Sequence, residues 1–226
     1  MDMQNASDYH PSDAVLAALR EVTLVAVVGV SGSGKTTLVN RACQQDPSLH
    51  VVVSDSSRSP RPEERDGVDY FFKRKADMLA AIDRREYVQV APSNSGDIYA
   101  THAENYTSDG PALITVWAEA IPAFRALPFR SMRTLYIVPS SYKTWQSRLD
   151  LHGFTPELRA QRLAEAERSL QFALADPDVE LIVNGDLAQA TADFLAAIHR
   201  PASVPRPDQT AARQLVRQLL QGLTKK

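Results

Sequence analysis

The stretch Gly29-Val30-Ser31-Gly32-Ser33-Gly34-Lys35-Thr36-Thr37 matches the phosphate-loop pattern G-x-x-x-x-G-K-[ST] at every position. The apolar run 22–28 before it predicts a buried strand, and residues 37–42 after it predict the start of a helix. Glycines here allow backbone N–H groups to turn toward a phosphate, and the helix dipole favours an anion. A Gly/Ser-rich turn without a ligand is the weaker alternative, because the flanking strand and helix are those that the motif requires. The motif therefore predicts nucleoside triphosphate binding.

Two side chains of this loop have specific expected roles. Lys35 is placed to reach the outer phosphates, and the Thr36 hydroxyl is placed to bind Mg²⁺. Contacts with the bound nucleotide are expected from the glycines and polar residues of the loop, which are Gly29, Ser31, Gly32, Ser33, Gly34, Lys35, Thr36 and Thr37.

Five short apolar runs predict the strands of the core: 22–28, 51–54, 112–117, 134–138 and 180–184. The runs are continuous rather than alternating, which is typical of strands that are covered on both faces. Helical patterns at 156–175 and 186–198 separate several of them. The alternation predicts βαβ units and a five-stranded parallel sheet. Together with the phosphate loop, it predicts a three-layer α/β fold of the P-loop NTPase type.

Composition restricts the function classes. The chain has 226 residues, a formal net charge of -2 and 23% charged residues, which do not indicate nucleic acid or an anionic membrane as a partner. The single cysteine, Cys43, excludes an internal disulfide and a multi-cysteine zinc site. No apolar run reaches the length of a membrane span, and the N-terminus lacks a signal-peptide pattern. We expect a cytoplasmic enzyme.

Residues 55–108 differ from the core and predict an inserted lobe that covers a second substrate. They are polar, with a short alternating piece at 87–90 and a helix near 75–85. Outside the core, residues 1–21 predict an extension with a short helix at Ala14–Leu19, and a Pro-rich linker spans 199–207. The last segment, 208–226, contains an amphipathic helix at 208–221 with three leucines on one face. This helix is expected to be a packing appendage or, as the less favoured alternative, a homodimer contact.

An arginine pair opens the predicted lobe. Arg58 and Arg61 are stiffened by Pro60 and Pro62, and paired guanidinium groups bind phosphate oxygens bidentately. Nearby serine and tyrosine hydroxyls add donors. The alternative is a solvated basic loop with surface ion pairs to its acidic neighbours. Beside a phosphate loop we favour a second phosphate site, because a kinase needs one for its acceptor.

At these residues the chain resembles the guanylate kinase family, from about residue 22 to residue 198. The family pattern is a serine, a short Ser/Thr run, R-x-P-R-x-x-E and then D/N-G-x-D-Y-x-F, and the matching positions are Ser54, Arg58, Pro60, Arg61, Glu64, Gly67, Asp69, Tyr70 and Phe72. The resemblance implies ATP-dependent transfer of a phosphate to the phosphate of GMP. It implies that Ser54, Arg58, Arg61 and Tyr70 hold the acceptor phosphate, with Glu64 as part of the same block.

The resemblance extends to the acceptor base and the donor site. Residues 96–101 look like a looser copy of G-N-Y-Y-G-[ST], in which Tyr99 matches a phosphate-binding tyrosine and Thr101 a base-contacting hydroxyl. Arg148 and Arg162 match the two ends of the family's lid, here about 143–162, and the resemblance places them near the transferring phosphates. Asn184, in a strand-end I-V-N-x-D, matches an asparagine near the adenine of ATP.

The chain departs from the family pattern mainly around the acceptor base. Gln89 aligns with a guanine-reading glutamate, Thr115 and Trp117 replace strand-end carboxylates, and His152 replaces a lid arginine. The loop at 96–101 is also lengthened. GMP is the leading acceptor, and AMP, another nucleotide or another phosphorylated compound is the alternative. A nucleotide-binding module with little catalysis is a third reading, which the retained Lys35 disfavours.

Overall fold

The computed structural model describes residues 9–61, 64–93 and 96–224 and divides the chain into two compact units. Unit 1 is formed by Met1–Leu24, His50–Ile114 and Pro122–Met132. Unit 2 is formed by Val25–Leu49, Thr115–Ile121 and Arg133–Lys226. Pro62 and Glu63 of the arginine block, and most of the N-terminal extension before α1, lie outside the described residues.

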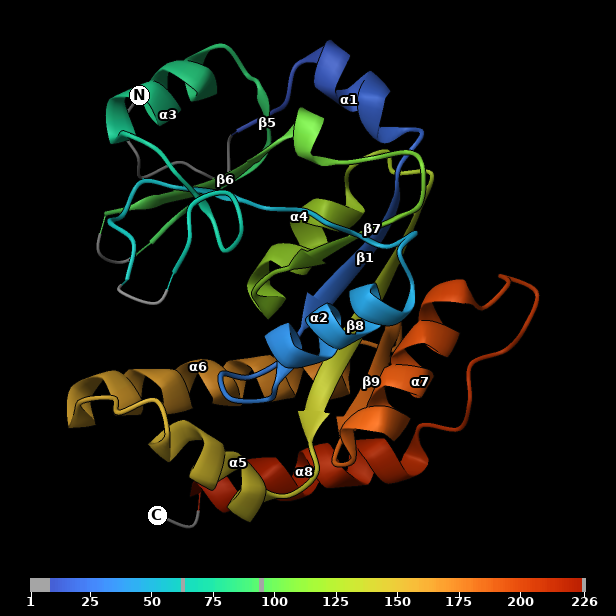
Figure 1. Cartoon of the computed structure of the whole chain (residues 1–226). Helices are drawn as coiled ribbons and strands as arrows, with labels where there is room; N and C mark the ends of the chain where they lie inside the picture. The colour runs from blue at the N-terminus through green and yellow to red at the C-terminus, as the bar shows by residue number, and fades with distance from the viewer. Residues whose placement is uncertain (1–8, 62–63, 94–95, 225–226) are drawn as a thin grey trace. The chain divides into compact units, whose positions relative to one another are not determined.

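A five-stranded parallel sheet has the strand order β2-β7-β1-β8-β9 (Figure 1). Four of its strands, all except the short β2, bury most of their residues, as the continuous apolar runs predict. Its strands are β1 (Thr23–Val28), β2 (His50–Val51), β7 (Pro111–Thr115), β8 (Ser131–Pro139) and β9 (Val179–Asn184). The predicted P-loop type α/β fold with a five-stranded parallel sheet is confirmed.

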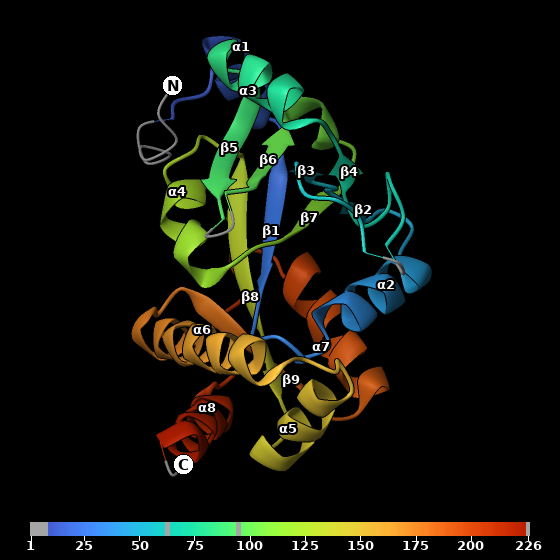
Figure 2. The ribbon, with the colours of Figure 1, turned by 90° about the vertical axis from the view of Figure 1, so that its left-hand side faces the viewer.

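Helices of unit 2 cover both faces of its strands (Figure 2), with α2 and α7 packed together and α6 packed against α8. Local capping explains where three of them begin: Ser141, Thr155 and Asp186 each accept a hydrogen bond from a backbone N–H in the following turn. The helices are α2 (Lys35–Gln45), α5 (Tyr142–Asp150), α6 (Pro156–Ala175), α7 (Leu187–His199) and α8 (Thr210–Thr224), with the short 3-10 helix η3 (Ala118–Ala120) after β7.

Unit 1 contains a second sheet with the order β4-β3-β6-β5, in which β3 and β5 both pair antiparallel with β6. Its strands are β3 (Asp55–Ser56), β4 (Phe71–Phe72), β5 (Tyr87–Pro92) and β6 (Ile98–His102). Helix α3 (Lys75–Asp83) buries Met78 and Ile82 in a cluster with Tyr87 and Ile98 of the sheet. Helix α1 (Asp13–Leu19) packs against β5 and the 3-10 helix η2 (Ala103–Asn105), and the short helix α4 (Ile121–Arg125) follows η3.

Several element boundaries differ by one to three residues from the sequence expectation. The strand expected at 51–54 ends at Val51, because Ser54 already pairs with the second sheet by accepting a hydrogen bond from Phe71 N. The strand expected at 112–117 ends at Thr115, and Trp117 instead precedes η3. The last helix begins at Thr210 and continues to Thr224. Among the described residues, no helix is long and apolar enough to span a membrane.

Candidate active site

The phosphate loop of unit 2 has a backbone that only glycine fits at two positions. Gly34 has a φ of 89°, and a β-carbon there would lie 2.4 Å from Asn184 Nδ2. Gly29 has a φ of 151°, and a β-carbon there would lie 2.7 Å from the Ile137 carbonyl oxygen. Positive φ and close backbone approach both select glycine. The G-x-x-x-x-G spacing is therefore a consequence of packing against β8 and β9 as well as of phosphate binding.

Lys35, the first residue of α2, directs its ammonium into the loop that precedes it. Its Nζ donates to the Gly29 carbonyl at 2.7 Å and to the Val30 carbonyl at 3.1 Å. Burial of the ammonium, together with the positive charge of Arg162, lowers the pKa of Lys35 to about 8. A phosphate anion at the loop would offset both effects, so the site is electrostatically suited to a polyanion.

Helix α5 is fastened to the same loop. Trp145, which is fully buried, donates from Nε1 to the Ser31 carbonyl at 2.8 Å. Arg148, one turn later, donates from Nη1 to the Ser33 carbonyl at 3.3 Å and from Nη2 to the Asn184 carbonyl at 3.5 Å. Asn184 Nδ2 also donates to the Ser33 carbonyl, at 2.8 Å. The expected adenine contact of Asn184 stays a prediction, because the structure shows its amide bound to the loop.

Arg162 extends this positive environment from α6. It forms an ion pair with Glu165 at 2.7 Å on the same helix, and its charge contributes to the lowered pKa of Lys35. The structure thus brings Lys35, Arg148 and Arg162 to one region of unit 2. The expected contact of the two arginines with the transferring phosphates stays a prediction. His152, which replaces a family arginine, is exposed and stacks on Phe154 with ring centroids 5.1 Å apart.

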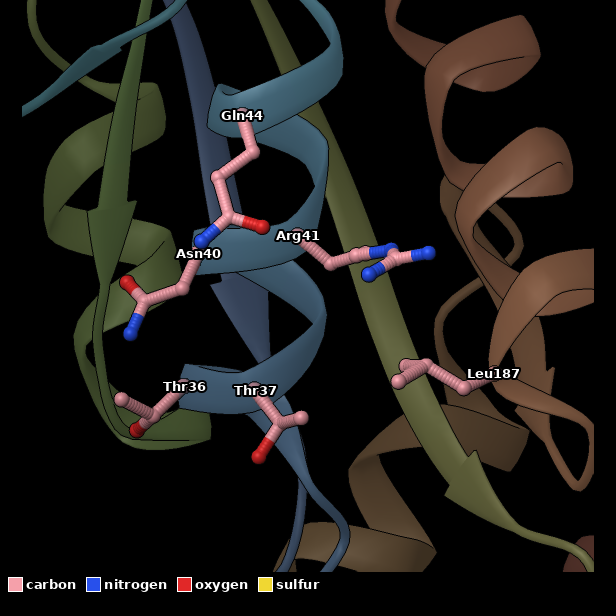
Figure 3. A pocket seen from close by; sticks show the side chains of 6 residues that line it. All are labelled: Thr36, Thr37, Asn40, Arg41, Gln44 and Leu187. Atoms are coloured by element: carbon pink, nitrogen blue, oxygen red, sulfur yellow. The ribbon is translucent and has the colours of Figure 1, made fainter.

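A cavity of about 310 Å³ opens beside the first turns of α2. Figure 3 shows its lining side chains, which project from α2 and from the start of α7. They are Thr36, Thr37, Asn40, Arg41, Gln44 and Leu187. Only Thr36 and Thr37 are predicted site residues. The spacing of residues 36, 40 and 44 places polar side chains on one face of a helix, and this signal in the sequence could have identified the remaining α2 residues.

The loop has features that fit a triphosphate and its magnesium ion. Ser33 Oγ is buried and has no hydrogen-bond partner among the described residues. The first N–H groups of α2 lack partners within the helix, as at every helix N-terminus. Thr36 exposes its hydroxyl at the first turn. Among residues 9–61, 64–93 and 96–224, no group of three or more His, Cys, Asp or Glu side chains is arranged to hold a metal ion.

In unit 1, Arg58 lies at the centre of the predicted acceptor site. Its Nη1 and Nη2 each donate to one carboxylate oxygen of Glu64, both at 2.6 Å, and its Nε donates to the Tyr99 hydroxyl at 3.1 Å. The guanidinium also lies over the rings of Tyr70 and Phe72, at 5.1 and 5.4 Å from their centroids. These contacts hold the arginine in one orientation, and Arg58 in turn lowers the pKa of Glu64.

Arg61 is the more accessible arginine of the pair. Its side chain is 58% exposed and lies 3.9 Å from Glu64, whose Oε2 also accepts from the Arg61 backbone N–H at 2.8 Å. Glu64 therefore organises both arginines. Its expected direct contact with substrate stays a prediction, since its carboxylate is already bound to Arg58.

The predicted base-reading residues share one face of the second sheet. Gln89 lies directly opposite Thr101 in the β5–β6 pair, and directly opposite residues point to the same side. Thr101 is fully buried, and its Oγ1 lies 3.0 Å from Ser54 Oγ. Tyr99, two residues before Thr101 on β6, lies on this face too and bonds Arg58. The sheet thus brings together the base-reading and phosphate-binding candidates.

Two non-acidic side chains, at the last residue of β7 and just after it, stand in place of the family's carboxylates. Thr115 is exposed, and Trp117 is 53% exposed. Glu119, the nearest carboxylate along the chain, forms a surface ion pair with Arg168 of α6 at 3.3 Å. The part of the chain described here therefore offers no strand-end carboxylate in the first residues after β7.

Comparison with known proteins identifies the family. The guanylate kinase family model matches residues 21–200. The chain is 33% identical to the guanylate kinase of Synechocystis sp., covering 74% of this chain and 88% of the relative. It is 31% identical to that of Dechloromonas aromatica, covering 77% and 87%. It is 29% identical to that of Salinibacter ruber, covering 78% and 95%.

The fold agrees with this assignment. The crystal structure of guanylate kinase from Anaplasma phagocytophilum matches with a TM-score of 0.58 at 23% identity, covering 78% of this chain and 83% of that one. The family match ends ten residues before α8 begins. With its complete phosphate loop and its retained arginine block, the chain belongs to the guanylate kinase family of nucleoside monophosphate kinases, as a divergent member.

Proposed function

We propose that the chain transfers the γ-phosphate of ATP to the phosphate of GMP, giving ADP and GDP. The observation that carries the proposal is the arrangement around the phosphate loop. The ammonium of Lys35 lies in the loop, and the guanidinium of Arg148 bonds the carbonyl of Ser33 in the same loop. Such an array of fixed cations suits phosphoryl transfer, in which charge spreads over the phosphoryl oxygens.

On the donor side, the loop N–H groups and Lys35 bind the phosphates of ATP. Thr36 holds Mg²⁺, which when bound neutralises charge on the phosphate oxygens. The cavity beside α2 supports a place for the nucleoside part of the donor, because it opens next to Thr36 and Thr37 and is lined by Arg41 and Leu187. Arg148 and Arg162 stabilise the charge of the transferring group.

On the acceptor side, Arg58 and Arg61 bind the GMP phosphate, with hydroxyls from Ser54, Tyr70 and Tyr99. A guanidinium binds phosphate oxygens through parallel N–H donors. Arg58 already bonds Glu64 through Nη1 and Nη2, so Glu64 aims it. Gln89 and Thr101 face the base.

In the reaction, an oxygen of the acceptor phosphate attacks the γ-phosphorus of ATP. A new phosphorus–oxygen bond forms, and the bond from the γ-phosphorus to the β–γ bridging oxygen breaks. ADP leaves with the electron pair. The attacking oxygen is already anionic at neutral pH, so the step needs no dedicated general base.

A second acceptor is supported by Gln89. An amide presents one donor and one acceptor, the combination that adenine also presents in complementary form. AMP is therefore the alternative acceptor within the same proposed chemistry.

Two further proposals concern the cellular location of the protein and its oligomeric state. The cytoplasm remains the expected location. A homodimer through the C-terminal helix remains a prediction, and Val216 and Leu219 of α8 are buried within the chain itself. A second copy would therefore have to bind the outer face of that helix.

The test is an ATP consumption assay with Mg²⁺ against GMP, AMP, other nucleoside monophosphates and a sugar phosphate. We expect turnover with a purine monophosphate. The variant Lys35→Ala should lose about 10²–10³ in rate, the typical effect of removing one charge-stabilising contact. The proposal is contradicted if Lys35→Ala turns over at the wild-type rate. It is also contradicted if the wild type phosphorylates none of the tested acceptors.

A further inference from the structure

The C-terminal helix α8 lies outside the family match, yet it contacts the elements that carry the donor site. Within unit 2 it packs against α6, β9 and α5 (Figures 1 and 2). At its start, Gln209 accepts a hydrogen bond from the Leu181 N–H of β9 at 2.6 Å. Arg213 donates to the Leu174 and Asp176 carbonyls, at 3.0 and 3.4 Å, and so caps the end of α6. The first turns of α8 are therefore firmly attached to the sheet and to α6.

The last turns of α8 meet α5 at an unusually close contact. A β-carbon at Gly222 would lie 2.4 Å from Cδ2 and 2.7 Å from Cε2 of Tyr142. Glycine is unfavourable inside a helix compared with alanine. Its presence in α8 is explained by the Tyr142 ring, which packs directly against the helix backbone where no side chain would fit.

Tyr142 continues this contact toward the phosphate loop. Its ring meets the Trp145 ring edge to face, with centroids 5.9 Å apart. Trp145 bonds the Ser31 carbonyl, and Arg148, three residues further along α5, bonds the Ser33 carbonyl. Leu149 adds a contact, since a β-carbon at Gly32 would lie 3.4 Å from its Cδ2. One face of α5 thus touches α8, and the neighbouring face touches the phosphate loop.

We infer that α8 acts as a brace for α5, with Gly222 and Tyr142 as positioning residues that set where Trp145 and Arg148 meet the phosphate loop. A methyl group added at Gly222 would displace the Tyr142 ring. The displacement would tilt α5, the helix that bonds two carbonyls of the phosphate loop. Packed interiors transmit such displacements because they have few voids. The expected consequence is on the donor side, because none of the contacts of α8 named above involves a residue of the acceptor block.

The test uses Gly222→Ala in the full chain, with Gln221→Ala as the matched control. Gln221 is exposed on the same turn, so its replacement introduces the same residue without meeting Tyr142. The first readout is acrylamide quenching of Trp145 in a Trp117→Phe background, which leaves Trp145 as the sole tryptophan. We expect Gly222→Ala to shift the Trp145 emission and increase quencher access, and Gln221→Ala to leave both unchanged.

The second readout rests on the proposed function. The KM for ATP should rise about threefold or more in Gly222→Ala, whereas the KM for the acceptor should stay near its wild-type value, because only a donor-side position changes. Failure of the wild type to consume ATP would refute the proposed function. The quenching measurement would still test whether α8 positions α5, because it does not depend on catalysis.

Tyr142→Ala completes a double-mutant cycle. Without the Tyr142 ring, the methyl group added by Gly222→Ala has no close neighbour to displace. In the Tyr142→Ala background, Gly222→Ala should therefore have no further effect on quenching or on the KM for ATP. Tyr142→Ala alone should itself loosen Trp145, and it carries the test if Gly222→Ala does not fold. Wild-type quenching and KM in both single variants would overturn the inference, and so would an equal effect of Gly222→Ala with and without Tyr142.

Discussion

Glu64 binds the guanidinium of Arg58 through both carboxylate oxygens, each at 2.6 Å. The pair is mostly buried, with side-chain exposures of 15% for Arg58 and 12% for Glu64. The Nε of Arg58 donates to the Tyr99 hydroxyl, and the guanidinium lies over the rings of Tyr70 and Phe72. Glu64 is therefore the residue that fixes the direction in which Arg58 can present its charge.

Glu64→Gln should raise the acceptor KM about tenfold while leaving the KM for ATP near its wild-type value. An amide has one acceptor oxygen, and its NH₂ would face a guanidinium donor. The lost charge-assisted bond should also lower the free energy of unfolding by about 1–3 kcal/mol at pH 7, measured by urea titration. The control is Glu86→Gln, which removes half of the exposed pair with Arg84, and its cost should stay within about 0.5 kcal/mol.

The same variant has a predicted pH dependence. Arg58 lowers the pKa of Glu64 in the folded protein, so the carboxylate stabilises the fold above its unfolded pKa of about 4.3. This contribution is lost as pH falls through the folded-state pKa. The stability gap between wild type and Glu64→Gln should therefore be constant near neutral pH and shrink in acid. A gap that widens in acid contradicts the assignment.

ATP binding should be coupled to protonation of Lys35. The pKa of its ammonium is about 8 in the protein alone, because burial and Arg162 disfavour the charge. Bound phosphates favour the charge and raise that pKa, so affinity should be highest below pH 8 and fall as pH rises through 8. Calorimetry above pH 7.5, in buffers of different ionisation heat, should detect proton uptake on binding. Lys35→Ala should bind with no such uptake, and equal uptake in both proteins would contradict the prediction.

The two arginines of the acceptor block should differ on substitution by lysine. Lysine keeps the charge but loses the planar fork. Arg61 is 58% exposed, so Arg61→Lys should raise the acceptor KM with little loss of stability. Arg58→Lys should raise the acceptor KM and also destabilise the protein, by about 1–3 kcal/mol, because its bonds to Glu64 and Tyr99 are lost. Equal weakening of ATP and acceptor by Arg61→Lys would assign it a donor-side or folding role instead.

The elements with strong local signals could be predicted from the sequence. The helix expected at 156–175 is α6 with the same bounds, because Thr155 caps it, Pro156 begins it and its apolar spacing is helical. The phosphate loop is equally local. The strand after Leu49 ends early, since its end depends on where the chain enters a second sheet. No property of residues 51–54 alone contains that information.

Contacts between distant residues could not be predicted in the same way. Asn184 bonds Ser33 across 151 positions, and Trp145 bonds Ser31 across 114. The sequence identified Asn184 only through the family pattern and did not identify Trp145 as part of the site. The Arg58–Glu64 pair is different, because the sequence named ion pairs with acidic neighbours as the alternative for the arginine block. What residue spacing could not show is that this pair is mostly buried and also contacts Tyr99.

Gln89 provides the sharpest test of acceptor choice. Guanine presents two N–H donors on its Watson–Crick edge, and a carboxylate accepts from both, whereas an amide has one acceptor oxygen. A guanine N–H left against the amide NH₂ costs about 1–3 kcal/mol, or roughly tenfold in affinity. Because Gln89 faces the same side as Thr101 and Tyr99, we predict a weaker preference for GMP over AMP than a glutamate would give.

Binding isotherms of GMP and AMP on the wild type and on Gln89→Glu measure this preference directly. Gln89→Glu should increase the ratio of GMP to AMP affinity about tenfold or more, since the carboxylate accepts from both guanine donors and repels the adenine ring nitrogen. The matched control is Gln44→Glu, which adds the same charge on α2, a helix that is not part of the second sheet. Gln44→Glu should leave the ratio unchanged. If Gln89→Glu also leaves the ratio unchanged, Gln89 does not read the base, and Thr101 or a water must do so.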